Sequence, residues 1–181
     1  MANCDICTVV IVLIGYMGCG KSTVGKQLAK AMGIPFVDLD AHMEKVEKMS
    51  IASIFDTKGE IYFRKKEATL LLELLDAKDP MILALGGGTP CYGNVMQELL
   101  SNANVITIYL QCSVELLTQR LWKEKETRPL IAHIATQEAL NEFIRKHLFE
   151  RSPFYMMASI KLHTNSRSQK ELVEQILFAL L

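Results

Sequence analysis

The sequence predicts an α/β fold in which helices cover both faces of a parallel sheet. Short, nearly continuous apolar runs alternate with longer segments whose apolar residues recur every three or four positions. A glycine-rich loop joins the first apolar run to the first helical pattern. Unbroken apolar runs are typical of parallel strands buried on both faces, and their alternation with helices implies right-handed crossovers. With 181 residues and no internal repeat or long linker, we expect a single domain over residues 1–181.

The expected elements can be placed along the chain from these two patterns. Strands are predicted at Val9–Ile14, Pro35–Leu39, Met81–Leu85, Val105–Leu110 and Ser159–Leu162. Helices are predicted to begin near Lys21, Glu60, Tyr92, Ser113, Thr136 and Ser168. Ligands of such sheets bind beyond the carboxyl ends of the strands, so the residues that follow each strand are the candidates for a site.

The composition argues against several classes of function. Twenty basic and twenty acidic residues cancel, so we expect no general attraction to nucleic acid or to an acidic membrane. No stretch approaches the roughly 18 consecutive apolar residues of a membrane span. No Lys or Arg precedes Lys21, so the early apolar run lacks the basic flank of a signal peptide. We therefore expect a cytoplasmic protein whose anion binding is local.

The five cysteines are an odd number, which favours reduced thiols over a disulfide framework. Cys4 and Cys7 form a C-x-x-C pair, but no second pair or nearby histidine completes a zinc site. Structural or incidental thiols are the favoured interpretation of this pair.

The strongest functional signal is the segment GYMGCGKS at residues 15–22, which matches the phosphate-binding pattern G-x-x-x-x-G-K-[ST]. It lies between an apolar run and a helical pattern, which is the context that the motif requires. Gly15 and Gly20 allow backbone angles that direct successive amides toward one anion, and the helix N-terminus adds partial positive charge. Lys21 can then reach the β- and γ-phosphates of a nucleoside triphosphate, and the Ser22 hydroxyl can ligate Mg²⁺.

Two carboxylates follow the second predicted strand, at Asp38 and Asp40. If the strand is still extended there, its period of two puts both carboxylates on one side of the chain. One could then help to hold Mg²⁺ and the other could orient or deprotonate an acceptor hydroxyl. The alternative is that Asp40 caps a helix and the other carboxylate is solvated. The spacing alone favours neither interpretation.

Three glycines, Gly86, Gly87 and Gly88, follow the third predicted strand. They pack nothing and cost chain entropy, so a close approach of the backbone to a ligand explains them better than a plain connection. Their N–H groups could bind a carboxylate or the hydroxyls of a small acceptor. A tight turn between strand and helix is the alternative interpretation.

Two arginines stand out by their context. Arg64 has Glu67 one helical turn later, and such a carboxylate can orient a guanidinium for a planar anion. A solvated surface pair is the alternative, and it is the commoner one for isolated pairs. Arg128 ends the charged run Lys123–Arg128 and precedes a proline. Charged runs are usually solvated, but a mobile segment at about residues 123–135 also suits a lid that closes over phosphates.

Together these elements resemble the shikimate kinase family over nearly the whole chain. The matching segments, in order, are GYMGCGKS, DLD, GEIYFR with Glu67, LGGG, TRPL and RSPFY. The resemblance implies the nucleoside-monophosphate-kinase type of phosphate-loop fold, a three-layer α/β/α arrangement with a five-stranded parallel sheet and a lid. It implies transfer of the γ-phosphoryl of ATP to the 3-hydroxyl of shikimate, in the biosynthesis of aromatic amino acids. ATP, Mg²⁺ and shikimate are the implied ligands, and a cytoplasmic monomer is the implied form.

The resemblance also implies roles for the matching residues. The catalytic ones are Lys21, Asp40 and Arg128, which bind the transferring phosphate or contact the acceptor hydroxyls. The residues implied to bind ATP are Gly18, Cys19, Gly20, Lys21, Ser22, Thr23 and Arg120, the last of them against adenine. The residues implied to bind shikimate are Asp40, Arg64, Gly86, Gly87, Gly88 and Arg151, with the two arginines on its carboxylate. The implied metal ligands are Ser22 and Asp38.

Two other functions are compatible with parts of the sequence. Another small-molecule kinase, for gluconate or a nucleoside monophosphate, would share the phosphate loop and the sheet, but it accounts less well for the arginines and the triple glycine acting together. A nucleotide-binding regulatory module without turnover would be easier to accept if Lys21, Asp40 or Arg128 were absent. The chain departs from the family at Leu39, often a hydroxyl residue, and at His163, where aspartate is more usual.

Overall fold

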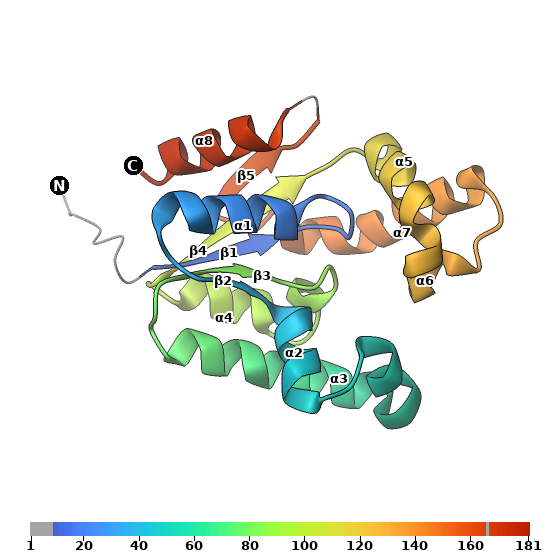
Figure 1. Cartoon of the computed structure of the whole chain (residues 1–181), viewed down its shortest axis with the longest axis horizontal. Helices are drawn as coiled ribbons and strands as arrows, with labels where there is room; N and C mark the ends of the chain where they lie inside the picture. Colours follow the sequence, from blue (N-terminus) through green and yellow to red (C-terminus); the bar gives the residue numbers. More distant parts are fainter. Residues whose placement is uncertain (1–8, 166) are drawn as a thin grey trace.

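The computed structural model describes residues 9–165 and 167–181, so Cys4 and Cys7 lie outside the described residues. Its five strands form one parallel sheet in the order β2-β3-β1-β4-β5, which confirms the predicted sheet between two layers of helices (Figure 1). The strands are β1 (Val10–Ile14), β2 (Phe36–Asp38), β3 (Met81–Ala84), β4 (Val105–Gln111) and β5 (Ile160–His163).

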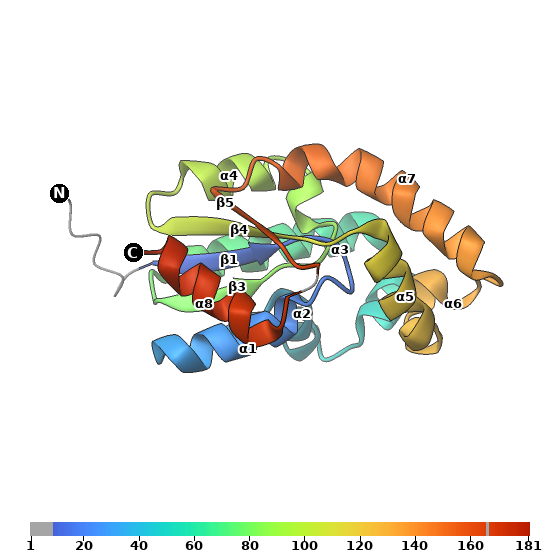
Figure 2. The same cartoon turned by 90° about the horizontal axis from the view of Figure 1, so that it is seen from above.

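The two faces of the sheet are covered by different helices (Figure 2). On one face lie α1 (Lys21–Met32) and α8 (Gln169–Ala179), and on the other lie α3 (Ile51–Asp76) and α4 (Val95–Ser101). The side chains of β1 alternate between these faces, as a strand requires, and all five are buried. The apolar run is therefore unbroken because both of its faces are in the core.

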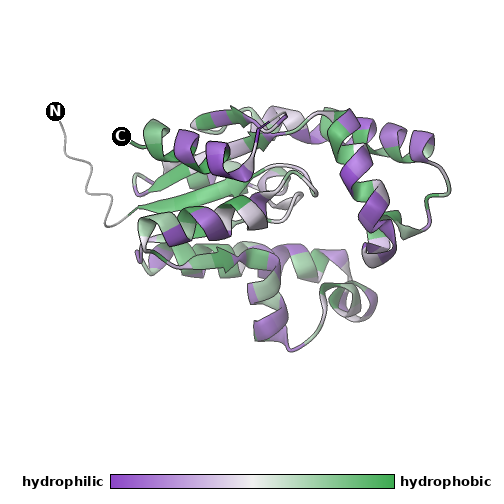
Figure 3. Cartoon of the chain, turned by 45° about the horizontal axis from the view of Figure 1, so that its top comes forward, coloured by the Kyte–Doolittle hydropathy of each residue, from purple (hydrophilic) through white to green (hydrophobic). Residues whose placement is uncertain are grey.

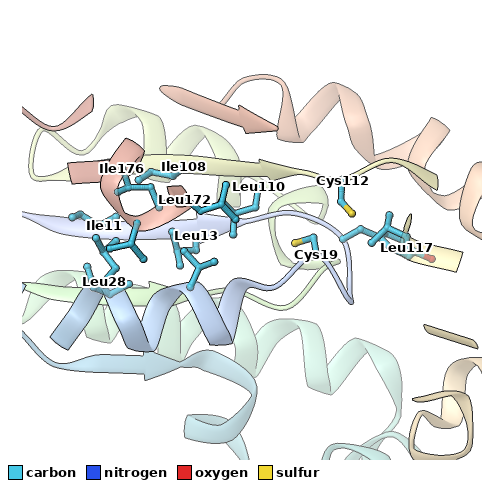
Figure 4. Packing of buried hydrophobic residues seen from close by; sticks show 14 of the residues in the cluster. Ile11, Leu13, Cys19, Leu28, Ile108, Leu110, Cys112, Leu117, Leu172 and Ile176 are labelled. Carbon is cyan, nitrogen blue, oxygen red and sulfur yellow. The ribbon is translucent and has the colours of Figure 1, made fainter. Parts of the chain in front are cut away.

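The packing on the α1 and α8 face shows how the core is built (Figure 4). Ile11 and Leu13 of β1 and Leu28 of α1 belong to one buried cluster with Leu172 and Ile176 of α8. The helices show hydrophilic outer stripes, whereas the strands are hydrophobic along their length (Figure 3). Over the described ranges, no helix combines the length and the apolar character that crossing a bilayer would need.

A helical segment that includes the predicted lid at residues 123–135 extends beyond the carboxyl ends of the strands (Figure 1). It consists of α5 (Val114–Glu124), a 3-10 turn (Lys125–Thr127), α6 (Pro129–Ala132) and α7 (Gln137–Tyr155). Ser113 and Thr136 cap α5 and α7, each accepting a hydrogen bond from a main-chain N–H three residues on. The charged run predicted as a lid thus lies between two capped helices.

The helices that follow β2 differ from the prediction. The strand ends at Asp38, α2 (Leu39–Glu47) begins at once, and α3 begins at Ile51 instead of near Glu60. Gly59 has a non-helical backbone (φ 78°) and interrupts α3, which hides the helical period of the preceding turns in the sequence. The fourth predicted helix also starts later, since α4 follows a 3-10 turn at Thr89–Cys91.

Candidate active site

A cavity of about 490 Å³ lies where the strands end. Its wall combines the loop after β1, the acids after β2, the glycines after β3, two arginines of the lid side, and the segment after β5. Twelve predicted site residues line it: Gly18, Cys19, Gly20, Lys21, Ser22, Thr23, Asp38, Asp40, Gly86, Gly87, Arg120 and Arg128. Three others, Arg64, Gly88 and Arg151, do not line this cavity. Gly88 directly follows Gly87 of the cavity wall, and a Cβ on Gly88 would lie 3.1 Å from Arg64 Nη2.

The loop after β1 has the backbone of an anion cradle. Gly15 and Gly20 have φ angles of 139° and 100°, which side chains other than glycine rarely adopt. A Cβ on Gly15 would also lie 2.8 Å from the main-chain oxygen of Leu110, so no larger residue fits there. Lys21 Nζ donates to the main-chain oxygens of Gly15 (2.8 Å) and Tyr16 (3.1 Å), which keeps the ammonium folded over the loop.

Cys19 contributes main chain and not a thiol to this loop. Its side chain is 1% exposed and packs in the apolar cluster beside Leu117 (Figure 4). Thr23, by contrast, is exposed in the first turn of α1 and faces the cavity. Both residues border the cavity, but only Thr23 offers a side chain to solvent.

Ser22 and Asp38 form a pair at the floor of the cavity. The Ser22 hydroxyl donates to Asp38 Oδ2 over 2.7 Å. The other oxygen, Oδ1, accepts from the N–H of Ala41 (3.4 Å), so Asp38 is the N-cap of α2. Neither interpretation of the two acids was correct in full. The helix cap is Asp38 instead of Asp40, and Asp40 reaches the cavity from the first turn of a helix instead of from an extended strand.

Asp40 is crowded by other acids and by the glycine loop. Its Oδ1 lies 3.1 Å from the position that a Cβ on Gly86 would take, so this glycine permits the close approach. The pKa of Asp40 is raised to about 6, chiefly by burial and then by the charges of Glu67 and Asp38, while Lys21 and Arg64 oppose the shift. The carboxylate therefore binds a proton more readily than an exposed aspartate, as a general base near neutral pH requires.

Glu67 connects Arg64 of α3 to the loop after β3. It is 3% exposed, and its two oxygens accept from Arg64 Nη1 (2.9 Å) and from the Thr89 hydroxyl (2.6 Å). The solvated-pair interpretation of Arg64 and Glu67 is therefore wrong, because the carboxylate has left water. A buried pair with both oxygens occupied fixes the guanidinium in one orientation.

The Arg64 guanidinium also has aromatic neighbours. It lies 4.0 Å from the ring centroid of Tyr92 and 4.9 Å from that of Phe63. A Cβ on Gly88 would lie 3.1 Å from its Nη2 atom, so the third glycine leaves room for this group. Arg64 Nε is buried without a hydrogen-bond partner, at 3.5 Å from Glu60 Oε1. The guanidinium thus retains hydrogen-bonding capacity while its position is fixed.

Arg151 of α7 lies beside an aromatic residue of the phosphate loop. Its guanidinium carbon lies 5.6 Å from the ring centroid of Tyr16. Burial raises the pKa of the Cys91 thiol to about 11, and the charges of Arg151 and Arg64 both oppose this shift. Cys91 therefore lies within electrostatic range of both arginines.

The two lid-side arginines have partners of their own. Arg120 Nη1 donates to the main-chain oxygen of Gly18 (3.1 Å), which ties α5 to the phosphate loop. Arg128 donates from Nη2 (2.7 Å) and Nε (3.1 Å) to Glu124 Oε2. Both line the cavity, but the Arg128 guanidinium is engaged with a surface carboxylate in this conformation.

Several residues of the site gave no signal in the sequence. Thr89 completes the Glu67 pair, and the Tyr155 hydroxyl donates to the main-chain oxygen of Gly87. Thr164, Arg167 and Gln169 form the end of the cavity near β5. These contacts join segments that are distant in the sequence, so no local pattern reports them. Thr89, directly after the triple glycine, is the one that its position could have suggested.

The site holds oxygen ligands but no complete metal centre. Across the described ranges, no group of three or more His, Cys, Asp or Glu side chains could hold a metal ion. Mg²⁺ is commonly held by one or two protein carboxylates together with phosphates and water.

Comparison with known proteins gives a consistent result. The family model described as "Shikimate kinase" matches residues 17–181. The shikimate kinase of Flavobacterium johnsoniae is 48% identical over 167 residues, covering 92% of this chain and 96% of that protein. That of Flavobacterium psychrophilum is 41% identical over 166 residues, with 92% and 95% covered.

Solved structures agree. A shikimate kinase from Acinetobacter baumannii in complex with shikimate has a TM-score of 0.82 at 33% identity and covers 97% of this chain and 94% of that one. A shikimate kinase from Bacteroides thetaiotaomicron has a TM-score of 0.80 at 31% identity, with 95% and 97% covered. A gluconokinase from Sinorhizobium meliloti (TM-score 0.63, 19% identity, 96% and 92% covered) shares the fold alone. The chain belongs to the shikimate kinase family, a family of ATP-dependent phosphotransferases.

Proposed function

We propose that this chain transfers the γ-phosphoryl group of ATP to the 3-hydroxyl of shikimate, giving shikimate 3-phosphate and ADP. The observation that carries the proposal is the position of Asp40. Its carboxylate is within electrostatic range of Lys21 of the phosphate loop and of the buried Arg64–Glu67 pair. It thus stands between a site for phosphates and a site for a small carboxylate, where an acceptor hydroxyl would meet the γ-phosphate.

ATP would bind with its phosphates in the loop of residues 15–20, at the N-terminus of α1. The main-chain N–H groups and Lys21 would hold the β- and γ-phosphates. Arg120, which already contacts Gly18, would pack on adenine at the end of the cavity. Thr23 would complete the contacts at the start of the helix.

Ser22 and Asp38 are suited to hold Mg²⁺. Their oxygens are hard ligands, they meet at 2.7 Å, and Mg²⁺ is usually bound by one or two protein oxygens together with phosphates and water. When bound, the ion would neutralise charge on the β- and γ-phosphates. The Ser22–Asp38 pair supports this assignment by its position on the cavity floor.

The carboxylate of shikimate would lie between Arg64 and Arg151. A guanidinium binds a planar carboxylate in bidentate geometry, and Glu67 keeps that of Arg64 in place. Gly86, Gly87 and Gly88 would allow the ring of the acceptor to approach the main chain. This arrangement selects a small anionic acceptor over a neutral one.

Phosphoryl transfer then depends on position and on charge. The acceptor oxygen forms a bond to the γ-phosphorus, the bond from that phosphorus to the β–γ bridging oxygen breaks, and Asp40 accepts the hydroxyl proton. Arg128 would leave Glu124 and neutralise the charge of the transferring group when the segment at residues 123–135 closes. Closure would also exclude water, which limits hydrolysis of ATP.

The test is the release of ADP from Mg²⁺–ATP with shikimate, gluconate, CMP, AMP or no acceptor. Turnover with shikimate alone is expected. Turnover with another acceptor would keep the phosphate site and reassign Arg64 and Arg151. ATP binding without turnover on any acceptor would favour a regulatory module. Since every residue of the proposed mechanism comes from one chain, we further infer a monomer, which sedimentation of the purified protein would test. A cytoplasmic location is inferred from the family resemblance.

A further inference from the structure

One face of α7 reaches both halves of the site. Phe143, His147, Arg151 and Tyr155 are spaced four residues apart, so they form a row along the helix. The Tyr155 hydroxyl donates to the main-chain oxygen of Gly87, in the loop after β3. His147 lies one turn before Arg151, and its Nδ1 is hydrogen-bonded to the hydroxyl of Tyr16 over 3.0 Å.

Tyr16 is part of the phosphate loop and is fixed at its main chain. Its carbonyl oxygen accepts from Lys21 Nζ (3.1 Å) and from the N–H of Cys19 (3.2 Å). Its side chain is 1% exposed, so the ring cannot move without disturbing the core. The hydroxyl at the far end of this ring meets His147, 131 residues later in the chain.

The His147 ring also has close aromatic neighbours. Its centroid lies 4.1 Å from that of the Phe143 ring and 6.2 Å from that of the Tyr16 ring. Burial lowers the pKa of His147, and the neighbouring charge of Arg151 lowers it further, although Glu150 opposes both. A neutral imidazole with its proton on Nε2 accepts a hydrogen bond from the Tyr16 hydroxyl at Nδ1 and does not repel Arg151.

The Tyr16 ring carries the Arg151 guanidinium on its face. The distance of 5.6 Å from the guanidinium carbon to the ring centroid is within the range of a cation–π interaction. The direction of this ring therefore affects where the guanidinium lies. The hydrogen bond to His147 ties this buried ring to the same helix that bears Arg151.

We propose that Tyr16 and His147 are positioning residues for Arg151. Their hydrogen bond ties the phosphate loop to α7, so that the guanidinium faces the acceptor instead of solvent. This inference rests on the proposed function, in which Arg151 binds the acceptor carboxylate. Tyr16, a residue of the phosphate loop, would thereby affect the binding of the acceptor.

Four variants test the pair: Tyr16→Phe, His147→Leu, the double variant, and His147→Asn. Tyr16→Phe keeps the ring and removes the hydroxyl, whereas His147→Leu removes the partner from outside the phosphate loop. Each should raise KM for shikimate by about three- to tenfold, the value of one hydrogen bond, with kcat and KM for ATP changed by less than about twofold. The double variant should show no more than either single change, and His147→Asn, which keeps an acceptor near Nδ1, should restore most of the affinity.

Arg151→Gln separates this inference from the proposed function. If it leaves KM for shikimate unchanged, the role of Arg151 itself fails. If it raises KM while Tyr16→Phe and His147→Leu do not, only the positioning role fails. Additive effects in the double variant, or equal rises in KM for ATP and for shikimate, would also overturn the inference, because they indicate a general disturbance of the loop. A thermal melt of each variant identifies any that is unfolded.

Discussion

Glu67 holds Arg64 and Thr89 at the same time, with one carboxylate oxygen 2.9 Å from Arg64 Nη1 and the other 2.6 Å from the Thr89 hydroxyl. The carboxylate is buried and both of its oxygens are occupied. The acceptor side of the site is therefore built as one unit from α3 and the loop after β3.

Replacing Glu67 with Ala should weaken both the acceptor site and the fold. Removing one member of a buried pair leaves the other charge without compensation, which costs about 3–5 kcal/mol of the free energy of unfolding. KM for shikimate should rise more than tenfold, by about the loss of an oriented charged hydrogen bond. Urea denaturation and steady-state kinetics measure the two effects.

The matched control is Glu142→Ala, which breaks the exposed pair with Lys146 (3.0 Å, side chains 68% and 72% exposed). It should change stability by less than about 1 kcal/mol and leave KM unaltered, as surface pairs do. Equal effects of Glu67→Ala and Glu142→Ala would contradict the buried-pair account.

Asp40 should lower the stability of the ligand-free protein at neutral pH. Burial raises its pKa to about 6 from the ordinary value of 3.8, so the folded protein takes up a proton at a higher pH than the unfolded chain does. The contribution to stability is present at low pH and is lost as pH rises through the folded pKa of about 6. Asp40→Asn, which is neutral throughout, should therefore have a higher free energy of unfolding than the parent at pH 8, by on the order of 3 kcal/mol.

Thermal melts at pH 8 and pH 4.5, without nucleotide and with a chelator, check this expectation. The advantage of Asp40→Asn should shrink at the lower pH. The exposed Asp79→Asn variant controls for the loss of one negative charge. If Asp40→Asn and the parent are equally stable at both pH values, burial of the Asp40 carboxylate does not destabilise the folded protein.

Arg128 should act in the chemical step and only after it leaves Glu124. Arg128→Ala should lower kcat by at least about 100-fold, as expected for a side chain that neutralises transition-state charge. Glu124→Ala, which removes the competing carboxylate, should leave kcat at or above the parent value. The control is Arg145→Ala, whose exposed pair with Glu115 lies outside the cavity.

The single tryptophan, Trp122, reports the movement directly, because it lies on α5 under the Lys125 ammonium (4.5 Å). ATP with shikimate should change its fluorescence in the parent protein and in Arg145→Ala. An unchanged kcat in Arg128→Ala would remove the lid arginine from the mechanism.

The parts of the site that the sequence predicted well are local ones. The phosphate loop needs only eight consecutive residues and the strand before it, and the pairing of Arg64 with Glu67 needs one helical turn. The convergence of Asp38 and Asp40 was predicted from a strand, but it arises from a helix that begins at Leu39. Here the helix signal was obscured because the cap, Asp38, is also the last residue of the strand.

The remaining features depend on tertiary contacts. Gly59 interrupts the helical period of α3, so the turns before it could not be recognised. Tyr16 and His147 meet across 131 residues, and Tyr155 reaches Gly87 across 68. Arg151 has no pattern of its own, since a single arginine on an amphipathic helix looks like a surface residue. Its assignment came from the family resemblance alone.

The most direct test of the account compares ADP release by the parent protein and by Asp40→Asn, with Mg²⁺–ATP and shikimate, alongside ATP binding by calorimetry. The Asp40→Asn variant should bind ATP with affinity close to that of the parent and lose at least about 100-fold in kcat, the usual contribution of a general base. Turnover by Asp40→Asn at the rate of the parent would contradict the central role of this carboxylate.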